Sequence, residues 1–346
     1  MDSKLDVFYD KAKNALSRRT FLAGAGAAGA ASVLAGCSSN SSPSYIGTPV
    51  VATAYTDTDI LNFALNLEYL EATFYLFAAT GKGLMASDTG SSPALITGGA
   101  KVPGLSTAQQ NILNEIAYDE QEHVRFLRAA LGSSAVIMPN IDLTDGFAGA
   151  VTAANSLTSS LPMIPTTFNP FATFDQFAVG AFVFEDVGVT AYAGAAPLIS
   201  AAGVAAGYLT AAAGIMAVEA YHAAYVRTYL TAQSISQGTT AYPYALFANR
   251  VSLLRAALGG GNETPLVASL ASATVPVTAT SPTVSASAIV PATSANSIAY
   301  ARTTDQVLHI VYGTFAASGG TTDAAGVSKG GFFPLGMTGN IHTTLS

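Results

Sequence analysis

Asp119-Glu120-Gln121-Glu122-His123 is the stretch that decides the fold, and it recurs ninety-nine positions later as Glu219-Ala220-Tyr221-His222. Both stretches contain Glu-x-x-His, and in both an aromatic, an aliphatic residue and an arginine follow in the same register. Residues three apart on an α-helix project from one face, so each Glu and His can reach one common point. The repeat therefore predicts two helices that present a carboxylate and an imidazole to the same place.

Two other stretches also resemble each other and carry glutamates. They are Leu67-Glu68-Tyr69-Leu70-Glu71 and Phe184-Glu185-Asp186, and a tyrosine follows seven residues after Glu68 and after Glu185. These tyrosines are Tyr75 and Tyr192. The pairing of four segments predicts an internal twofold, in which a bundle is built from two similar helix pairs.

The surroundings of these acids are unusually apolar. Hydrophobic residues make up 50% of the chain and charged residues only 10%, against roughly 25% charged residues in an ordinary soluble domain. The stretches 177–196 and 201–224 have almost no polar face, which is typical of buried helices. An unpaired carboxylate inside such a helix costs several kcal/mol, so a compensating partner is expected.

The helical pattern predicts four long helices with recognisable ends. Capping boxes open three of them, at Thr56, Ser106 and Thr173, and glycines follow the first two, at Gly81 and Gly132. In a helix bundle, a long connection crosses from one end to the other. The expected helices cover residues 56–80, 107–131, about 174–194 and about 203–231, with the long crossover 132–172 in the middle.

The last third of the chain differs from this bundle. Residues 232–346 are expected to form an extension that packs on it, with helices at 243–258 and 297–312. The stretch 262–296 is rich in Ala, Ser, Thr, Val and Pro and is expected to be an extended loop. In the tail, the adjacent aromatics Phe332 and Phe333 are expected to pack against the protein.

One glutamate from each of two helices, with Glu-x-x-His from each of the other two, is the ligand pattern of ferritin-like dinuclear metal proteins. Residues 56–231 resemble such a ferritin-like domain, an all-α four-helix bundle. Glu68 and Tyr75 have the spacing of the first helix in bacterioferritins and rubrerythrins. Residues 301–313 and the Gly-Gly-Phe-Phe-Pro-Leu-Gly tail are similar to the desiccation-related proteins of plants and bacteria. The chain departs from rubrerythrins in having no rubredoxin-type cysteines.

The resemblance implies a dinuclear centre with two metal ions, iron rather than manganese. Carboxylates and imidazoles together suit either metal, and four carboxylates can balance two divalent ions. The implied ligands are Glu68, Glu120, His123, Glu185, Glu219 and His222. Glu71 is the alternative ligand from the first helix; otherwise Glu71 and Glu122 face solvent or the arginines Arg125 and Arg128.

Several neighbouring residues are open to two interpretations. Asp186 either accepts from a ligand histidine or is a helix-surface charge. Tyr75 and Tyr192, like Tyr118 and Tyr221, either hydrogen-bond to the ligands or relay electrons, or they pack in the core. Arg128 and Arg227 recur at one register and are expected to balance remaining carboxylates, whereas His309 and His342 are expected to be ordinary residues outside the site.

The N-terminus carries a targeting pattern. Ser17-Arg18-Arg19-Thr20-Phe21-Leu22 precedes a short apolar run that ends in Leu34-Ala35-Gly36-Cys37. This order resembles a twin-arginine export signal, residues 1–36, followed by a lipoprotein box with Cys37 as the lipidated residue. Residues 37–55 are then a flexible tether. The expected location is the periplasmic or cell-envelope side of a membrane, with the protein anchored there through Cys37.

Net charge and cysteine content exclude some partners and some kinds of site. The net charge of −7 argues against nucleic acid as a partner. The single cysteine excludes an intramolecular disulfide and a cysteine-based zinc or iron–sulfur site. Expected partners are metal ions, with O₂ or peroxide, and a homodimer is left open.

The expected function is metal binding in oxidative or desiccation stress protection. The alternatives are a di-metal oxidase, peroxidase or catalase-like enzyme, and a structural protein with a vestigial site. The sequence leaves open whether any catalysis occurs.

Overall fold

The computed structural model describes residues 55–91, 94–266, 289–293, 297–313 and 328–341. Within these ranges the chain is predominantly helical, as predicted, and it forms an all-α bundle with a helical extension. The predicted signal 1–36, Cys37, tether residues 38–54 and His342 lie outside the described residues.

The bundle consists of α3 (Asp57–Thr80), α5 (Thr107–Leu131), α7 (Phe174–Ala195) and α9 (Tyr208–Gln237). Extensive contacts join α3 to α5 and α7 to α9, and the two pairs meet mainly through α3 and α7. By contrast, α5 and α9 touch at few points. This arrangement agrees with two similar helix pairs and leaves the side between α5 and α9 less closed.

The helix starts follow the sequence signals closely. Thr56 and Ser106 each form a complete capping box, with Asp59 and Gln109 respectively. At α7 the prediction was only half right, because Thr173 accepts from the Gln176 amide but the Gln176 side chain does not return the bond. The Gln176 side chain instead accepts from the backbone of Asn169, which fixes the end of the crossover.

The fourth expected helix is divided. A short α8 (Ala201–Ala206) ends at Gly207, whose φ of 91° breaks the helix before α9 begins. The last helix then continues beyond residue 231 to Gln237 and stops at Gly238. No proline or glycine lies between 231 and 237, so nothing in the chain ends the helix earlier.

The crossover is not the plain loop that was expected. It contains α6 (Leu143–Ser156), capped by Asp142, whose side chain accepts from two amides of the first turn. Gly and Ala dilute the apolar period of this segment, which is why the sequence pattern missed the helix. Just before it, β2 (Ile141–Asp142) pairs in parallel with β1 (Ile96–Thr97), and a short α4 (Ala86–Thr89) precedes β1.

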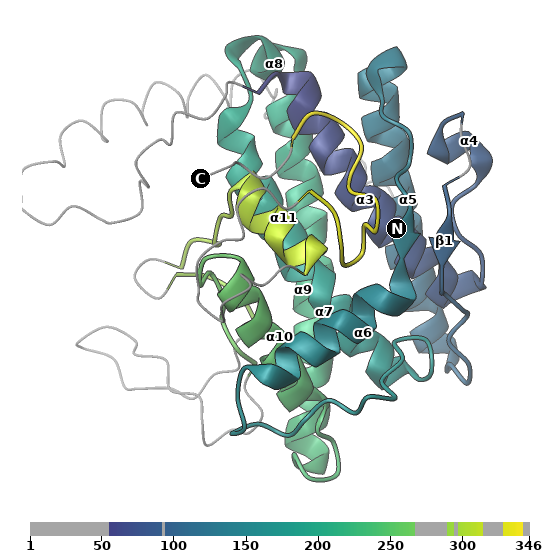
Figure 1. Ribbon diagram of the computed structural model, residues 1–346, viewed down its shortest axis with the longest axis vertical. Helices are drawn as coiled ribbons and strands as arrows, with labels where there is room; N and C mark the ends of the chain where they lie inside the picture. The colour runs from purple at the N-terminus through teal and green to yellow at the C-terminus, as the bar shows by residue number, and fades with distance from the viewer. Residues whose placement is uncertain (1–54, 92–93, 267–288, 294–296, 314–327, 342–346) are drawn as a thin grey trace, which may run out of the picture. The chain divides into compact units, whose positions relative to one another are not determined.

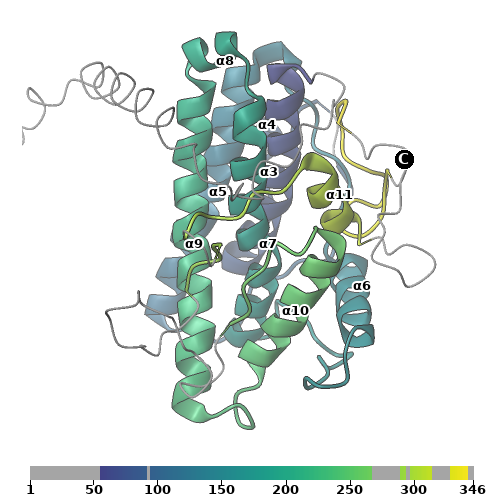
Figure 2. The ribbon, with the colours of Figure 1, turned by 90° about the vertical axis from the view of Figure 1, so that its left-hand side faces the viewer.

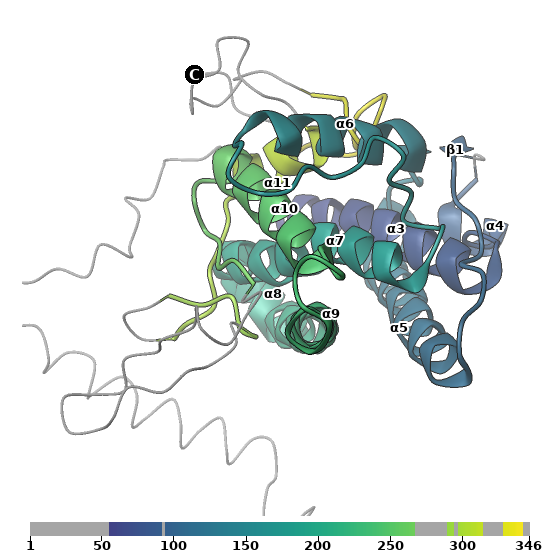
Figure 3. The same cartoon turned by 90° about the horizontal axis from the view of Figure 1, so that it is seen from below.

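The C-terminal extension contributes α10 (Tyr244–Leu258) and α11 (Thr304–Tyr312). Together with α6 they lie on the side of α3 and α7 that faces away from α9 and α5 (Figure 3). Phe332 and Phe333 are buried, as predicted, and Phe332 packs edge-on against Phe147 and Phe184. Within the described ranges, the extension and α6 therefore cover the α3–α7 side of the bundle and not the α5–α9 side.

A buried arginine joins α10 to the end of α6. Arg250 of α10 is fully buried and donates to backbone carbonyls at the end of α6, including those of Ala154 and Thr158. Ala154 belongs to the last turn of α6, where carbonyls lack the regular amide partner four residues on, and Thr158 follows the helix end. Thus α10 secures the crossover, which in turn lies against the bundle.

The stretch Phe174–Leu198 is long and apolar enough to cross a membrane, but 89% of its most apolar window is buried. It forms the centre of the bundle, where Phe177 and Phe184 pack around Phe74 of α3. Burial on all sides explains its lack of a polar face.

Candidate metal centre

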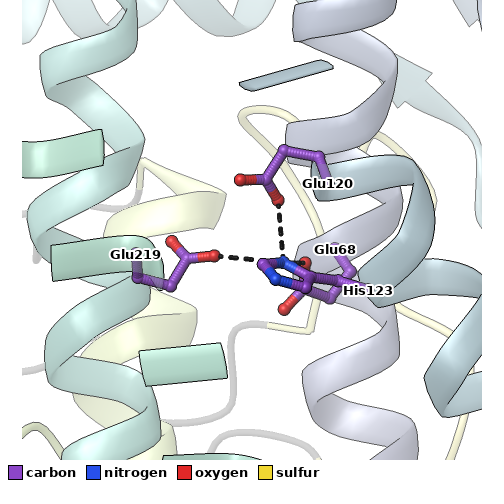
Figure 4. A group of neighbouring side chains, drawn as sticks. All are labelled: Glu68, Glu120, His123 and Glu219. Carbon is purple, nitrogen blue, oxygen red and sulfur yellow. Dashed lines mark hydrogen bonds and ion pairs between the residues drawn. The ribbon is translucent and has the colours of Figure 1, made fainter. Parts of the chain in front are cut away.

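The four bundle helices each send carboxylates to one interior point, and two of them add an imidazole. Figure 4 shows part of this group, in which Glu68 comes from α3, Glu120 and His123 from α5, and Glu219 from α9. The i, i+3 spacing puts each Glu and His on one helix face, as the repeat indicated. All six predicted residues are buried: Glu68, Glu120, His123, Glu185, Glu219 and His222.

The donor atoms fall into two groups that share one residue. Glu68, Glu120, His123 and Glu219 form the first group, and Glu120, Glu185 and His222 form the second. Within each group the donor atoms lie within 4.8 Å of one another. The structure thus brings the six predicted residues together in two adjoining clusters.

Glu120 stands between the two clusters. One of its oxygens, Oε2, lies 3.5 Å from His123 Nδ1, and the other, Oε1, lies 3.0 Å from His222 Nδ1. His123 Nδ1 is also 3.2 Å from Glu68 Oε2 and 3.5 Å from Glu219 Oε1. A carboxylate whose two oxygens face two different imidazoles is placed to bridge two ions.

Many of these donor atoms have no hydrogen-bond partner among the described residues. They include both oxygens of Glu120, both of Glu219, Glu185 Oε2 and His222 Nδ1, all buried. Buried polar atoms without partners are rare in native proteins, because each costs about 1–3 kcal/mol or more when charged. The set consists only of carboxylate oxygens and imidazole nitrogens, which suits iron or manganese. The residues therefore fit a metal centre.

The electrostatics of the metal-free cluster indicate the same need for cations. Burial and neighbouring acids raise the pKa of Glu219 and of Glu71 well above the ordinary value. Burial opposes charge on both imidazoles, yet the surrounding carboxylates prevail and raise the pKa of His123 to about 11 and of His222 to about 10. In the metal-free cluster, bound protons therefore supply the positive charge that metal cations would otherwise supply.

Two tyrosines hydrogen-bond to the cluster in a reciprocal manner. Tyr75 of α3 donates to Glu185 of α7, and Tyr192 of α7 donates to Glu68 of α3. Both tyrosines are buried, so they pack in the core and orient the acids at the same time. Tyr75 and Tyr192 thus both hydrogen-bond to ligand carboxylates and pack in the core.

Asp119 is a residue of the site that the sequence reading did not single out. Its Oδ2 lies 3.2 Å from His222 Nε2, on the side of the imidazole that points away from the cluster. A carboxylate in this position fixes the tautomer and the orientation of a ligand histidine. Asp119 directly precedes Glu120, but only the packing of α5 against α9 shows which histidine it meets.

Glu71 does not face solvent or an arginine, so that expectation was wrong. Its side chain is 5% exposed, and neighbouring Glu120, Glu68 and Glu185 help to raise its pKa. It lies one helical turn beyond Glu68, on the face that the bundle buries. Glu122, in contrast, forms an ion pair with Arg125 at 2.7 Å, as expected, and its side chain is 42% exposed.

Asp186 is neither a partner of a histidine nor a surface charge. It is buried and pairs with Arg227 and Arg255, each at 2.8 Å. Arg255 continues to Glu263 at 2.8 Å, and Arg302 reaches the same glutamate at 2.6 Å. This buried arginine cluster links α7 and α9 to the C-terminal extension, which the bundle sequence alone could not indicate.

Three further expectations need correction. Arg128 does not balance a carboxylate; it donates to the Tyr69 hydroxyl at 2.6 Å, because its register faces α3 above the cluster. Tyr118 and Tyr221 are 60% and 78% exposed, so neither packs in the core nor orients a ligand. They point outward because they occupy the solvent side of α5 and α9.

A groove between α5 and α9 leads to the outer edge of His222. Its volume is about 380 Å³, and its walls include Asp119 and His222. Glu115 and Tyr221 stand toward its outer part, with aliphatic residues between them. The groove thus meets the site at the ring edge of His222 that faces Asp119.

Residues 56–232 match the family model of the ferritin-like domain. The chain belongs to the ferritin-like family. Over 299 residues it is 30% identical to the ferritin-like catalase Nec2 of Nesocodon mauritianus, which covers 82% of this chain and 84% of that protein. It is also 31% identical over 214 residues to the desiccation-related protein PCC13-62 of Craterostigma plantagineum, covering 59% of this chain and 63% of that one. No solved structure gives a significant match.

The ferritin-like resemblance and its desiccation-related branch are thus confirmed. The region of this ferritin-like protein that matches the family model ends at residue 232. The match to Nec2 is longer than the ferritin-like domain, so the similarity includes part of the chain outside the bundle.

Proposed function

We propose that the two ligand groups, which share Glu120, would hold two metal ions, iron rather than manganese, and that the protein disproportionates hydrogen peroxide. In this reaction two molecules of peroxide give two of water and one of dioxygen. The observation that carries the proposal is the pair of adjoining ligand groups that share Glu120, with His222 of the second group at the groove. The name of the relative Nec2, a ferritin-like catalase, supports the same reaction.

The charge of the cluster fits two divalent ions. Glu68, Glu120, Glu185 and Glu219 supply four negative charges when ionised, which two such ions neutralise. Glu71 adds a fifth carboxyl group nearby, and burial favours its neutral form. The metal pair would supply the redox chemistry, taking two electrons from one peroxide and returning them to the next.

The residues around the two metal ions would provide access to the site and hold the ligands in position. The groove between α5 and α9 admits a small polar molecule to the His222 side of the cluster. Asp119 holds the His222 ring through Nε2 and keeps Nδ1 directed inward. Tyr75 and Tyr192 keep Glu185 and Glu68 in place, and the aromatic core behind them keeps bulk water away from the α3–α7 side.

A protective role without catalysis, suggested by the relative PCC13-62, would need no access path. The groove beside His222 therefore favours catalysis over simple sequestration of metal. Removal of peroxide would itself protect the protein's surroundings against oxidation, so the stress role and the enzyme role agree.

The test is oxygen release from peroxide by protein loaded with iron or with manganese, measured with an oxygen electrode. We expect release by wild type, a strong loss in His222→Ala, and wild-type release in Glu122→Ala, whose side chain pairs with Arg125 outside the cluster. Metal bound without any oxygen release would reject the catalase proposal and leave a binding protein.

We also propose export and a lipid anchor at Cys37. The support is the order of the twin arginines and the Leu-Ala-Gly-Cys box, both in sequence outside the described residues. A Cys37→Ala variant is expected to appear in the soluble envelope fraction. Unchanged membrane association would reject the anchor, and cytoplasmic retention of the wild type would reject export as well.

A further inference from the structure

At one end of the bundle, a long stretch of chain carries no charged residue. From Val187 to Val218 there is no Asp, Glu, Lys, Arg or His. The first part of this stretch is buried in α7, but the part from Pro197 onward is largely exposed. Exposed helix faces normally carry charges, so an uncharged exposed face needs an explanation.

Large apolar side chains stand on this surface. Leu198, Val204 and Leu209 are 45%, 46% and 36% exposed, and Phe126 of α5 is 47% exposed. Phe126 also lines an apolar hollow together with residues of the turn around α8, among them Ile199 and Tyr208. The surface of residues 197–214 with Phe126, called the apolar end below, is thus continuous between α5 and α9.

The chain joins the bundle at this same end. Asp57, at the start of α3, accepts from the Ser200 amide at 2.7 Å and from the Ser200 hydroxyl at 2.6 Å. Ser200 caps α8, so the first turn of α3 lies directly against the apolar end. Figures 1 and 2 show α8 and the start of α3 together at one end of the bundle. The segment that carries Cys37 therefore leads to Tyr55 beside this surface.

We propose that the apolar end rests on a lipid surface. This inference depends on the proposed anchor at Cys37, because the tether would then hold the start of α3, and with it the apolar end, near a membrane. A tethered surface needs little affinity of its own, because the tether keeps its effective concentration high. Exposed apolar patches with a polar surround commonly mark membrane or protein contacts, and the tether selects the membrane.

The acids beside the apolar end indicate the headgroup charge of the lipid that it would contact. Asp57 and Asp59 are the acids at the start of α3, and hydrogen bonds with Ser200 and Thr56 lower their pKa, so both stay ionised. They disfavour an anionic surface, so the partner is a membrane of zwitterionic lipid. The groove at His222 lies about 20 Å along α9 from Tyr208, so docking leaves it open to solvent.

Cysteine labelling can test this surface because Cys37 is the only cysteine of the chain. In the lipidated protein its thiol is blocked, so a new cysteine takes the dye alone. The pair to compare is Val204→Cys, on the apolar end, and Ser236→Cys, an exposed position at the other end of α9. Each would carry an environment-sensitive dye on full-length lipidated protein bound to phosphatidylcholine vesicles.

We expect a blue shift at position 204, quenched by lipids that carry a quencher, and water-like emission at position 236. Adding Leu209→Glu should abolish the shift at 204, whereas Thr228→Glu, exposed further along α9, should not. Water-like emission at both positions, with the protein still floating with vesicles, would overturn docking and leave the anchor intact. Loss of flotation by the wild type would reject the anchor and docking together. A shift at 204 that ignores lipid quenchers and rises with protein concentration would mean a contact between copies and would also overturn the proposal.

Discussion

Gly188 of α7 faces the carboxylate of Glu219 of α9 so closely that no side chain could stand between them. A Cβ at position 188 would lie 2.3 Å from Glu219 Oε2 and 3.3 Å from Glu71 Oε1. The helix gains nothing from a glycine in its interior, which costs roughly 0.5–1 kcal/mol relative to alanine. The glycine is explained by the room that the buried acids need.

The substitution Gly188→Ala should therefore displace Glu219 and lower the metal bound per chain. The measurement is metal content after dialysis, by mass spectrometry of the element. Gly214→Ala on α9 is the control, because nothing lies within 4 Å of a Cβ there. If Gly188→Ala kept the wild-type content, Glu219 would not be needed as a ligand.

Removing the tyrosine hydroxyls should weaken metal binding without unfolding the protein. Tyr75→Phe and Tyr192→Phe keep the buried rings but lose the hydrogen bonds to Glu185 and Glu68. Loss of such an orienting partner typically costs about 10–100-fold in metal affinity. Competition with a chelator would measure this, with Tyr118→Phe, at a 60% exposed position, as the control. Affinities equal to the control would mean that the rings only pack.

Stability should depend on pH in opposite ways with and without metal. Carboxylates raise the pKa of His222 to about 10 in the folded protein, above roughly 6.5 for an unfolded chain. This contribution is complete below pH 6.5 or so and is lost as pH rises toward 10. Burial raises the pKa of Glu185 to about 8, so it too destabilises the metal-free protein as pH rises. The two histidines hold the pKa of Glu120 at about 2 against the effect of burial, so its stabilising contribution is complete above about pH 4.5 and is lost as pH falls toward 2.

Metal binding requires neutral imidazoles and ionised carboxylates, so it strengthens as pH rises. The melting temperatures of loaded and metal-free protein should thus differ more at about pH 9 than at about pH 5. Scanning calorimetry of both forms across this range checks the prediction. A constant gap would show that protons and metal do not compete for the cluster.

Breaking the buried arginine cluster should cost far more than breaking a surface pair. Arg255→Met leaves Asp186 and Glu263 buried with one partner fewer, and such losses cost about 3–5 kcal/mol. Glu122→Gln removes only a partly exposed pair, because Arg125 keeps its ion pair with Asp88, and should cost about 1 kcal/mol or less. Urea unfolding gives both values. Similar small losses would mean that the extension is held by apolar packing alone.

The sequence predicted the bundle because its signals are local. Capping residues, glycine stops and the 3.6-residue period define α3, α5 and α7, and the duplicated motif gives the inward face of Glu120 and Glu219. The roles of Glu71 and Asp119 were harder to predict, because these residues join the site only through the packing of the helices against one another. The role predicted for Asp186 was wrong for a related reason: its partner Arg255 comes from outside the bundle.

The most direct test of the dinuclear centre is the metal content of purified wild type, Glu185→Ala and Glu122→Ala. We predict two ions per chain in the wild type, one for each ligand group. Glu185 belongs to the second group, so Glu185→Ala should bind clearly less, whereas Glu122→Ala should match the wild type. Equal content in all three proteins, or no metal in any of them, would contradict the account and leave these buried acids as a polar core.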